Sequence, residues 1–134
     1  MAGTVIVPWY ATGFRADAFE SALGDVAATA LRYGASSYDV YRARDDRYKF
    51  QQLARFEHHL QWDRYWSGPE MTRFRIEHSG WYQVPVVYGW WDRTAGGEIR
   101  TGDAAPIGNG QGNGLAGNGK VPNGDRGIVE GESA

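Results

Sequence analysis

Apolar positions in the first third of the chain change from strand-like to helical spacing. Residues Thr4–Tyr10 read Thr-Val-Ile-Val-Pro-Trp-Tyr, a β-branched and aromatic composition typical of a strand. From Ala16 onward the apolar residues recur three and four positions apart, and Gly34 provides a C-terminal stop. The stripe comprises Phe19, Ala22, Leu23, Val26, Ala30 and Leu31. The pattern predicts a strand followed by an amphipathic helix.

The middle of the chain has the pattern of a β-hairpin. Ser36–Arg42 and Tyr48–Phe56 both favour strands, and the polar residues Asp45, Asp46 and Arg47 between them favour a turn. The two strands are therefore expected to pair in an antiparallel arrangement.

Helical spacing returns after the hairpin. His58–Trp66 predicts a helix that is interrupted at Ser67-Gly68, and Pro69 suits the first turn of a second helical piece running to about His78. Gly80 ends that piece. Residues Tyr82–Trp91 then predict a fourth strand, in which Pro85 indicates a sheet edge or a bulge.

The order strand, helix, strand, strand, helix, strand predicts an α+β fold of the ferredoxin-like, split βαβ type. Two helices would cover one face of a four-stranded antiparallel sheet. The other face should be polar in a lone domain, yet Ile6, Pro8 and Tyr10 alternate with the apolar Val5, Val7 and Trp9 on the first strand. Because a large exposed apolar face is unusual in a monomer, a homodimer that packs sheet against sheet is expected.

Aromatic residues end where glycines accumulate. All 19 aromatic residues lie at or before Trp91, whereas residues 94–134 hold 12 of the 19 glycines. Such a composition buries too little apolar surface to offset chain entropy. We therefore expect one folded domain over residues 1–93 and a flexible, disordered Gly/Asn-rich tail over residues 94–134.

Composition and charge exclude several classes of function. The net charge of −2, with both signs interspersed, argues against binding to nucleic acid or to an anionic membrane surface. The absence of cysteine excludes disulfides, thiolate metal sites and a cysteine nucleophile. The longest apolar stretches, 4–10 and 84–91, fall short of the ~20 residues that span a bilayer, and the N-terminus lacks the pattern of a signal peptide. A cytoplasmic location is expected.

Residues 3–93 resemble a known family. The helical region Phe56–Trp66, followed by Ser-Gly-Pro-Glu-Met at residues 67–71, and the final strand Val84–Trp90 are similar to the antibiotic biosynthesis monooxygenase (ABM) domain of the dimeric α/β barrel superfamily. The resemblance implies a homodimer with a pocket in each subunit between sheet and helices. The superfamily includes cofactor-independent monooxygenases that oxidise anthrones and quinols, haem-degrading monooxygenases, and members without known chemistry.

The resemblance distinguishes between these activities. The haem-degrading branch uses a first-strand asparagine with a tryptophan and a histidine from the second helical region. Here Trp66 and His78 are 12 residues apart across a Gly-Pro break, and the first strand has no asparagine. The anthrone-oxidising branch uses an aromatic, hydrogen-bonding pocket that helps to deprotonate a phenolic substrate, which then reduces oxygen directly. This branch needs no cofactor, and none is expected here.

The resemblance and the residue types together suggest a site. Trp66, His59 and Tyr10 are the candidate catalytic residues. The candidate substrate-binding residues are Trp62, Tyr38, Tyr65 and His78.

Each candidate also has an ordinary structural interpretation. His58 and His59 point about 100° apart on a helix, so at most one faces a site, and either can be a surface histidine. Trp62 and Trp66 share a helix face at i and i+4, which equally fits core packing. The spacing of His59, Asp63 and His78 fits no helical metal pair, so no metal is expected.

Two arginines on the second helical piece suit an anionic substrate. Arg73 or Arg75 could bind a carboxylate bidentately, but Glu70 lies three residues before Arg73. A surface ion pair between Glu70 and Arg73 is the favoured interpretation.

Two functions remain open. The first is a cofactor-independent monooxygenase that oxidises an aromatic polyketide-type or quinol substrate with molecular oxygen. The alternative is a non-catalytic dimeric binding or assembly module whose C-terminal tail docks on a protein partner. Deleting residues 94–134 separates them, since the enzyme would keep its turnover and the module would lose its partner.

Overall fold

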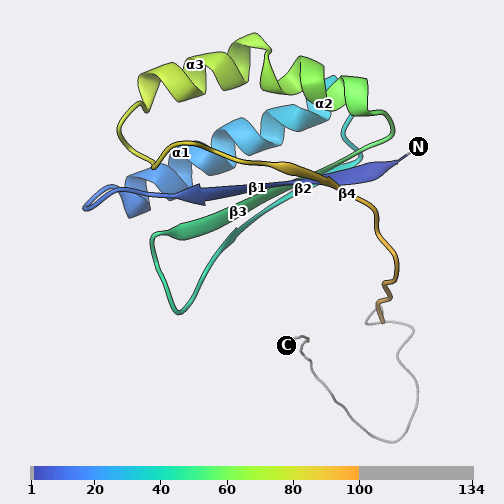
Figure 1. The fold of residues 1–134 in the computed structure, drawn as a ribbon, viewed down its shortest axis with the longest axis horizontal. Coiled ribbons are helices and arrows are strands. Elements are labelled where there is room, and N and C mark those ends of the chain that lie inside the picture. Colours follow the sequence, from blue (N-terminus) through green and yellow to red (C-terminus); the bar gives the residue numbers. More distant parts are fainter. Residues whose placement is uncertain (1, 100–134) are drawn as a thin grey trace, which may run out of the picture. The chain divides into compact units, whose positions relative to one another are not determined.

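The computed structural model describes residues 2–99. Most of the predicted tail, from residue 100 onward, lies outside the described residues. The secondary structure follows the predicted order strand, helix, strand, strand, helix, strand, with the second helical region in two pieces (Figure 1). The elements are β1 (Gly3–Tyr10), α1 (Ala16–Ala28), the 3₁₀ helix η1 (Thr29–Tyr33), β2 (Ser37–Arg42), β3 (Lys49–Phe56), α2 (His59–Trp66), α3 (Pro69–Glu77) and β4 (Gly89–Trp91).

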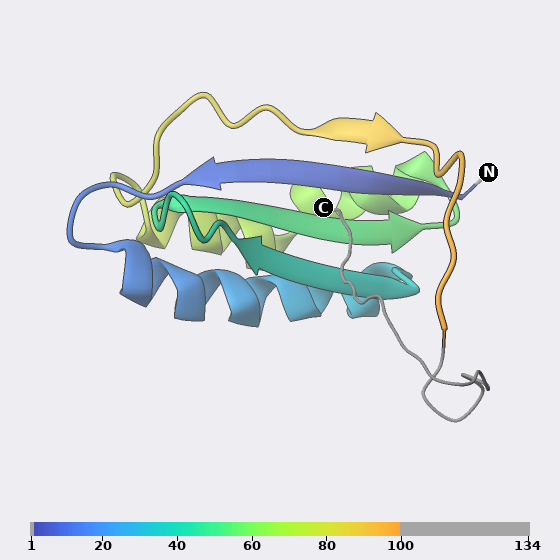
Figure 2. The same cartoon turned by 90° about the horizontal axis from the view of Figure 1, so that it is seen from below.

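The four strands form one antiparallel sheet in the order β2-β3-β1-β4 (Figure 2). The three α-helices lie on the same face of this sheet (Figure 1). This arrangement is the predicted ferredoxin-like α+β fold. Because β1 and β3 occupy the centre, their helix-facing side chains form the floor of the core.

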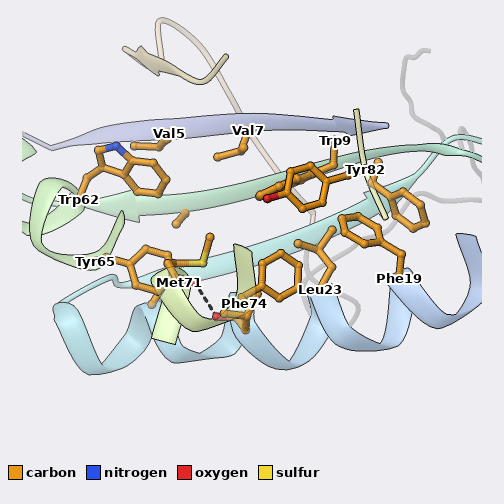
Figure 3. Close-up of a cluster of buried hydrophobic side chains, with 14 of the residues drawn as sticks. Val5, Val7, Trp9, Phe19, Leu23, Trp62, Tyr65, Met71, Phe74 and Tyr82 are labelled. Atoms are coloured by element: carbon orange, nitrogen blue, oxygen red, sulfur yellow. Dashed lines mark hydrogen bonds between the residues drawn. The ribbon is translucent and has the colours of Figure 1, made fainter. Parts of the chain in front are cut away.

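Alternation along β1 separates the two faces of the sheet. Val5, Val7 and Trp9 are buried against the helices, together with rings from α1, α2 and α3 (Figure 3). The register pairs Val5 with Ala54 and Trp9 with Phe50, so β3 presents its buried side chains to the same side. The core is therefore a single layer between sheet and helices.

Helix ends fall at the predicted glycines. The 3₁₀ helix η1 that continues α1 ends at Gly34, whose φ of 98° is the left-handed conformation that glycine adopts without strain. Gly68 separates α2 from α3, and a Cβ atom there would lie 2.6 Å from the Tyr33 hydroxyl and 2.8 Å from the Arg64 carbonyl oxygen. The joint thus needs glycine for close packing.

The last strand is shorter than predicted. The sequence favours a strand over Tyr82–Trp91, but the structure pairs only Gly89–Trp91 with β1, plus an isolated bridge between Tyr82 and Ala11. Pro85 has no N–H to donate to a ladder, and Val84 and Val87 are exposed. The segment before β4 therefore runs beside β1 without joining the sheet, and the prediction of a long strand was wrong.

The face of the sheet opposite the helices is only partly apolar. Ile6 lies between Leu53 and Gly89 on this face, and both Ile6 and Leu53 are half-buried. Further along, Tyr41 and Trp91 are more than half exposed. We call this surface the open face.

Candidate functional site

Helix α2 brings three of the predicted site residues together. The rings of Trp62 and Trp66 stack with centroids 5.3 Å apart and planes inclined by 29°. The Tyr65 ring lies 5.8 Å from that of Trp62. The i, i+4 spacing of the two tryptophans produces this stack, as expected for one helix face.

The three side chains differ in their access to solvent. Trp62 and Tyr65 are 1% and 0% exposed, whereas Trp66 is only partly buried. Trp62 and Tyr65 thus serve as core side chains beneath Trp66. Of these three residues, Trp66 is the one with ring surface available to a ligand.

Tyr65 anchors this part of the core through its hydroxyl group. The hydroxyl donates a hydrogen bond to the Val26 carbonyl oxygen at 2.5 Å and accepts one from the Gln52 amide at 3.4 Å. Gln52 also accepts a hydrogen bond from the Trp9 indole at 3.0 Å. Burial raises the pKa of Tyr65 to about 12. The phenol therefore stays neutral near pH 7 and joins α2 to α1 and the sheet.

The two predicted histidines lie away from the stacked tryptophans. His59, in the first turn of α2, places Nδ1 3.2 Å from the Asp63 carboxylate, and its ring lies 5.0 Å from the Trp90 ring. His78 follows the end of α3, where Nδ1 lies 2.8 Å from the Phe74 carbonyl oxygen. Both rings are therefore engaged in local contacts.

The two predicted strand tyrosines are also separate from α2. Tyr10 points to the open face, where its hydroxyl donates to Asp46 at 2.8 Å. That hydrogen bond raises the pKa of Tyr10. Tyr38 lies on the edge strand β2 and is partly exposed. The structure therefore brings Trp62, Tyr65 and Trp66 together and leaves the other four candidates at separate positions.

Two further aromatic residues surround Trp66. The Tyr88 ring, from the segment before β4, lies 5.1 Å from Trp66 and 4.9 Å from Trp62. The Trp9 ring on β1 lies 6.1 Å from Trp66. We call Trp9, Trp62, Trp66 and Tyr88 the aromatic wall. Tyr88 was not among the predicted site residues, because it lies in the segment Tyr82–Trp91 that the sequence predicts as the fourth strand.

Arg75 on α3 packs against this wall. Its guanidinium carbon lies 4.3 Å from the centroid of the Trp66 ring, a cation–π distance. Burial lowers the pKa of Arg75. The Glu70 carboxylate instead binds Tyr33 and Arg32 at 2.5 and 3.3 Å, so the predicted surface pair with Arg73 was wrong.

The sequence offered both Arg73 and Arg75 as ligands of an anionic substrate, and helical spacing distinguishes the two. Met71, Phe74, Arg75 and His78 follow the i, i+3, i+4, i+7 spacing of one helix face. Met71 and Phe74 are buried. A cation on the buried stripe of a helix is unusual and indicates either a buried partner or a ligand.

Two buried donor atoms at the wall lack partners. Among the described residues, no acceptor lies within hydrogen-bond distance of Arg75 Nη1 or of Trp62 Nε1. Buried polar groups are normally hydrogen-bonded. Since both atoms are donors, the arrangement suits a ligand that carries acceptor oxygens.

Residues 2–99 contain neither a cluster of metal ligands nor a membrane-spanning helix. No group of three or more histidine, cysteine, aspartate or glutamate side chains in this range could hold a metal ion. Nor is any helix in this range long and apolar enough to cross a membrane.

Comparisons with solved structures identify the class of fold. A putative antibiotic biosynthesis monooxygenase from Nitrosomonas europaea matches with a TM-score of 0.63 at 15% identity, over 69% of this chain and 90% of that one. SnoaB, a cofactor-independent oxygenase from Streptomyces nogalater, matches with a TM-score of 0.62 at 18% identity, over 71% and 95%. A Pseudomonas aeruginosa protein matches with a TM-score of 0.63 at 22% identity, over 70% and 95%.

The chain therefore has the fold of the antibiotic biosynthesis monooxygenases, as its sequence resemblance predicted. Searches of protein-family models and of curated proteins found no match. At these identities the comparisons show the fold alone, and the activity has to be argued from the site.

Proposed function

We propose that the protein is a cofactor-independent monooxygenase that oxidises an aromatic, polyketide-type or quinol substrate. The observation that carries the proposal is the partly exposed Trp66 ring within the aromatic wall. Flat aromatic molecules stack on such rings in offset or edge-to-face geometry. The occurrence of the same fold in a cofactor-independent oxygenase supports the proposal.

The chemistry balances without an external reductant. In an anthrone, a CH₂ group flanked by aromatic rings becomes C=O, which is a four-electron oxidation. Molecular oxygen accepts those four electrons; one oxygen atom enters the product and the other leaves as water. The substrate supplies all the electrons once it has lost a proton, so the protein has to bind the ring system and favour its ionised form.

Trp66 has the central role in this proposal. It provides the ring against which the substrate lies, and Trp62 and Tyr88 hold that ring in place. His59 and Tyr10 stay predictions as catalytic residues, and Tyr38 and His78 stay predictions as substrate-binding ones. His59, Tyr10 and His78 hydrogen-bond elsewhere, and Tyr38 lies on the edge strand β2.

A homodimer belongs to the same proposal. The half-buried Ile6 and Leu53 lie side by side on the open face. A second copy packed on the open face would cover these side chains, and the opposite face would keep the aromatic wall.

Oxygen uptake tests the proposed function. With 1,8-dihydroxyanthrone as substrate, the protein should raise oxygen consumption above the spontaneous rate, because it favours the ionised substrate. Trp66→Leu should lower kcat/KM by about twofold to tenfold, since a lost aromatic stack is worth about 0.5–1.5 kcal/mol. Phe14→Ala, which truncates a fully exposed ring, is the matched control.

Two results would contradict the proposal. A wild-type rate equal to that of the buffer would remove the activity. A Trp66→Leu protein that folds and turns over as fast as the Phe14→Ala control would show that the aromatic wall does not bind the substrate.

A further inference from the structure

Arg75 is a half-buried cation without a counter-ion, and its Nη1 atom is shielded from solvent. Within residues 2–99 it forms no salt bridge, although Arg32 and Arg42 each reach carboxylates. Shielding a guanidinium N–H from water without a hydrogen-bond acceptor is unfavourable. The side chain keeps this position by stacking on Trp66.

The groups that face Arg75 are phenols. Tyr82 and Tyr88 lie within electrostatic reach of the guanidinium, and the Tyr82 hydroxyl donates to the Arg75 backbone carbonyl oxygen at 3.4 Å. Neither phenol accepts a hydrogen bond from Arg75 Nη1. The guanidinium therefore retains an unused donor beside an aromatic surface.

We propose that Arg75 binds the ionised oxygen of a flat aromatic substrate that stacks at Trp66. The inference rests on the proposed function and names its substrate class, a phenolate or the equivalent enolate. A guanidinium N–H to an anionic oxygen is a charge-assisted hydrogen bond, stronger than a neutral one. Arg75 would thus favour the deprotonated substrate, which is the form that reduces oxygen.

The test uses a phenol that reports its own ionisation. The phenolate of 4-nitro-1-naphthol absorbs visible light, so titration in the presence of the full-length protein gives the pKa of the bound probe. Wild-type protein should bind the phenolate about tenfold to a hundredfold more tightly than the phenol, which appears as a pKa lowered by about one to two units. An unchanged probe pKa on wild-type protein would overturn the inference.

Variants assign the effect to Arg75. Arg75→Met should abolish the preference for the phenolate while keeping the affinity for neutral 1-nitronaphthalene, and Arg75→Lys should retain part of it because the charge remains. Arg73→Met, which removes an exposed arginine two positions away on α3, should behave as wild type. If Arg75→Met retains the wild-type preference, the inference is wrong. If 1-naphthoate binds and the nitronaphthol pKa stays unshifted, the site takes carboxylates and the inference is also wrong.

Oxygen uptake by the same preparations separates this inference from the proposed function. A lowered probe pKa that depends on Arg75, without oxygen uptake, would support the anion site at Arg75 and contradict the proposed oxygenase activity. Oxygen uptake with the same probe pKa on wild type and Arg75→Met would keep the oxygenase and remove the role of Arg75.

Discussion

Tyr65 shows how one buried hydroxyl group joins several elements. Its oxygen contacts Val26 on α1 and Gln52 on β3, while its ring packs against Trp62 and Phe56. Replacing it with phenylalanine would remove the acceptor of the Gln52 amide N–H in a buried region and would leave the Val26 carbonyl with the Thr29 hydroxyl as its side-chain donor. We therefore regard Tyr65 as a structural residue of the site region. It packs against Trp62, which in turn stacks on Trp66.

The raised pKa of Tyr65 predicts a loss of stability at alkaline pH. Below pH 10 the phenol is neutral in both states, so its contribution is complete. Between pH 10 and about 12 the unfolded chain ionises first, so the free energy of unfolding falls, by about 2–3 kcal/mol in total. Urea unfolding at pH 8 to 12 measures this slope.

Tyr65→Phe provides the comparison. The variant should be less stable by about 1–3 kcal/mol at pH 8, because two buried groups lose a partner, and its stability should fall less steeply between pH 10 and 12. Equal slopes in the two proteins would show that another group causes the alkaline loss.

At the scale of elements, the joint between α2 and α3 positions both tryptophans and Arg75. Pro69 begins α3 directly after Gly68, and the Tyr33 hydroxyl lies close above this glycine. Arg75 then comes to lie over a ring from the preceding helix. A change in the angle of this joint would separate Arg75 from Trp66.

Two glycine substitutions test the role of the joint. Gly68→Ala should destabilise the protein by about 1–3 kcal/mol, because its Cβ would overlap the Arg64 carbonyl oxygen and the Tyr33 hydroxyl. Gly24→Ala, in the interior of α1 with nothing within 4 Å of the new Cβ, should stabilise it by about 0.5–1 kcal/mol. Thermal unfolding measures both, and equal effects would contradict the close packing at Gly68.

At the scale of the whole molecule, the sheet has two different faces. The helix-facing side of β1 and β3 is fully buried, whereas the open face combines apolar side chains with charged ones such as Lys49 and Arg55. An interface between folded subunits is, as a whole, about as apolar as the rest of a protein surface, so this mixed composition is compatible with subunit contact. The proposed dimer would use the apolar centre of this face, at Ile6 and Leu53.

Ile6→Lys tests the dimer. Native mass spectrometry of the wild-type protein should show twice the 14.9 kDa chain mass. A lysine at the centre of the open face would have to bury its ammonium group on association, so the variant should shift to monomer, while Ser21→Lys on the exposed side of α1 should stay dimeric. A wild-type monomer would overturn the dimer, and a dimeric Ile6→Lys protein would place the interface elsewhere.

The predicted order of elements and most of their boundaries came from local signals. The stripe from Phe19 to Ala30, the stop at Gly34 and the Pro69 start of α3 each depend on residues a few positions apart, and the structure confirms them. Leu31, the last residue of the predicted stripe, is 50% exposed, because α1 ends at Ala28 and the chain continues as the tighter 3₁₀ helix η1. The length of the strand predicted over residues 82–91 was overestimated. Its composition favours a strand, but a strand forms only where the backbone hydrogen-bonds to a neighbouring strand. Around Pro85, which has no N–H to donate, the chain does not form hydrogen bonds of the ladder with β1.

The candidate site was predicted less completely. The pair Trp62 and Trp66 was found from its i, i+4 spacing, which is a property of one helix. Tyr88 and Arg75 reach the same rings from other elements, and no local pattern encodes such contacts.

By itself, the sequence determined the fold class and the two tryptophans of α2, because helical and strand periodicity and the positions of glycine and proline act over short distances. Only the tertiary structure decided that Trp62 and Tyr65 are sealed in the core while Trp66 stays partly exposed. It also decided that Arg75 stacks on Trp66 without a carboxylate partner. Burial and charge pairing depend on which distant segments pack together, and this is determined by the packing of the helices against the sheet.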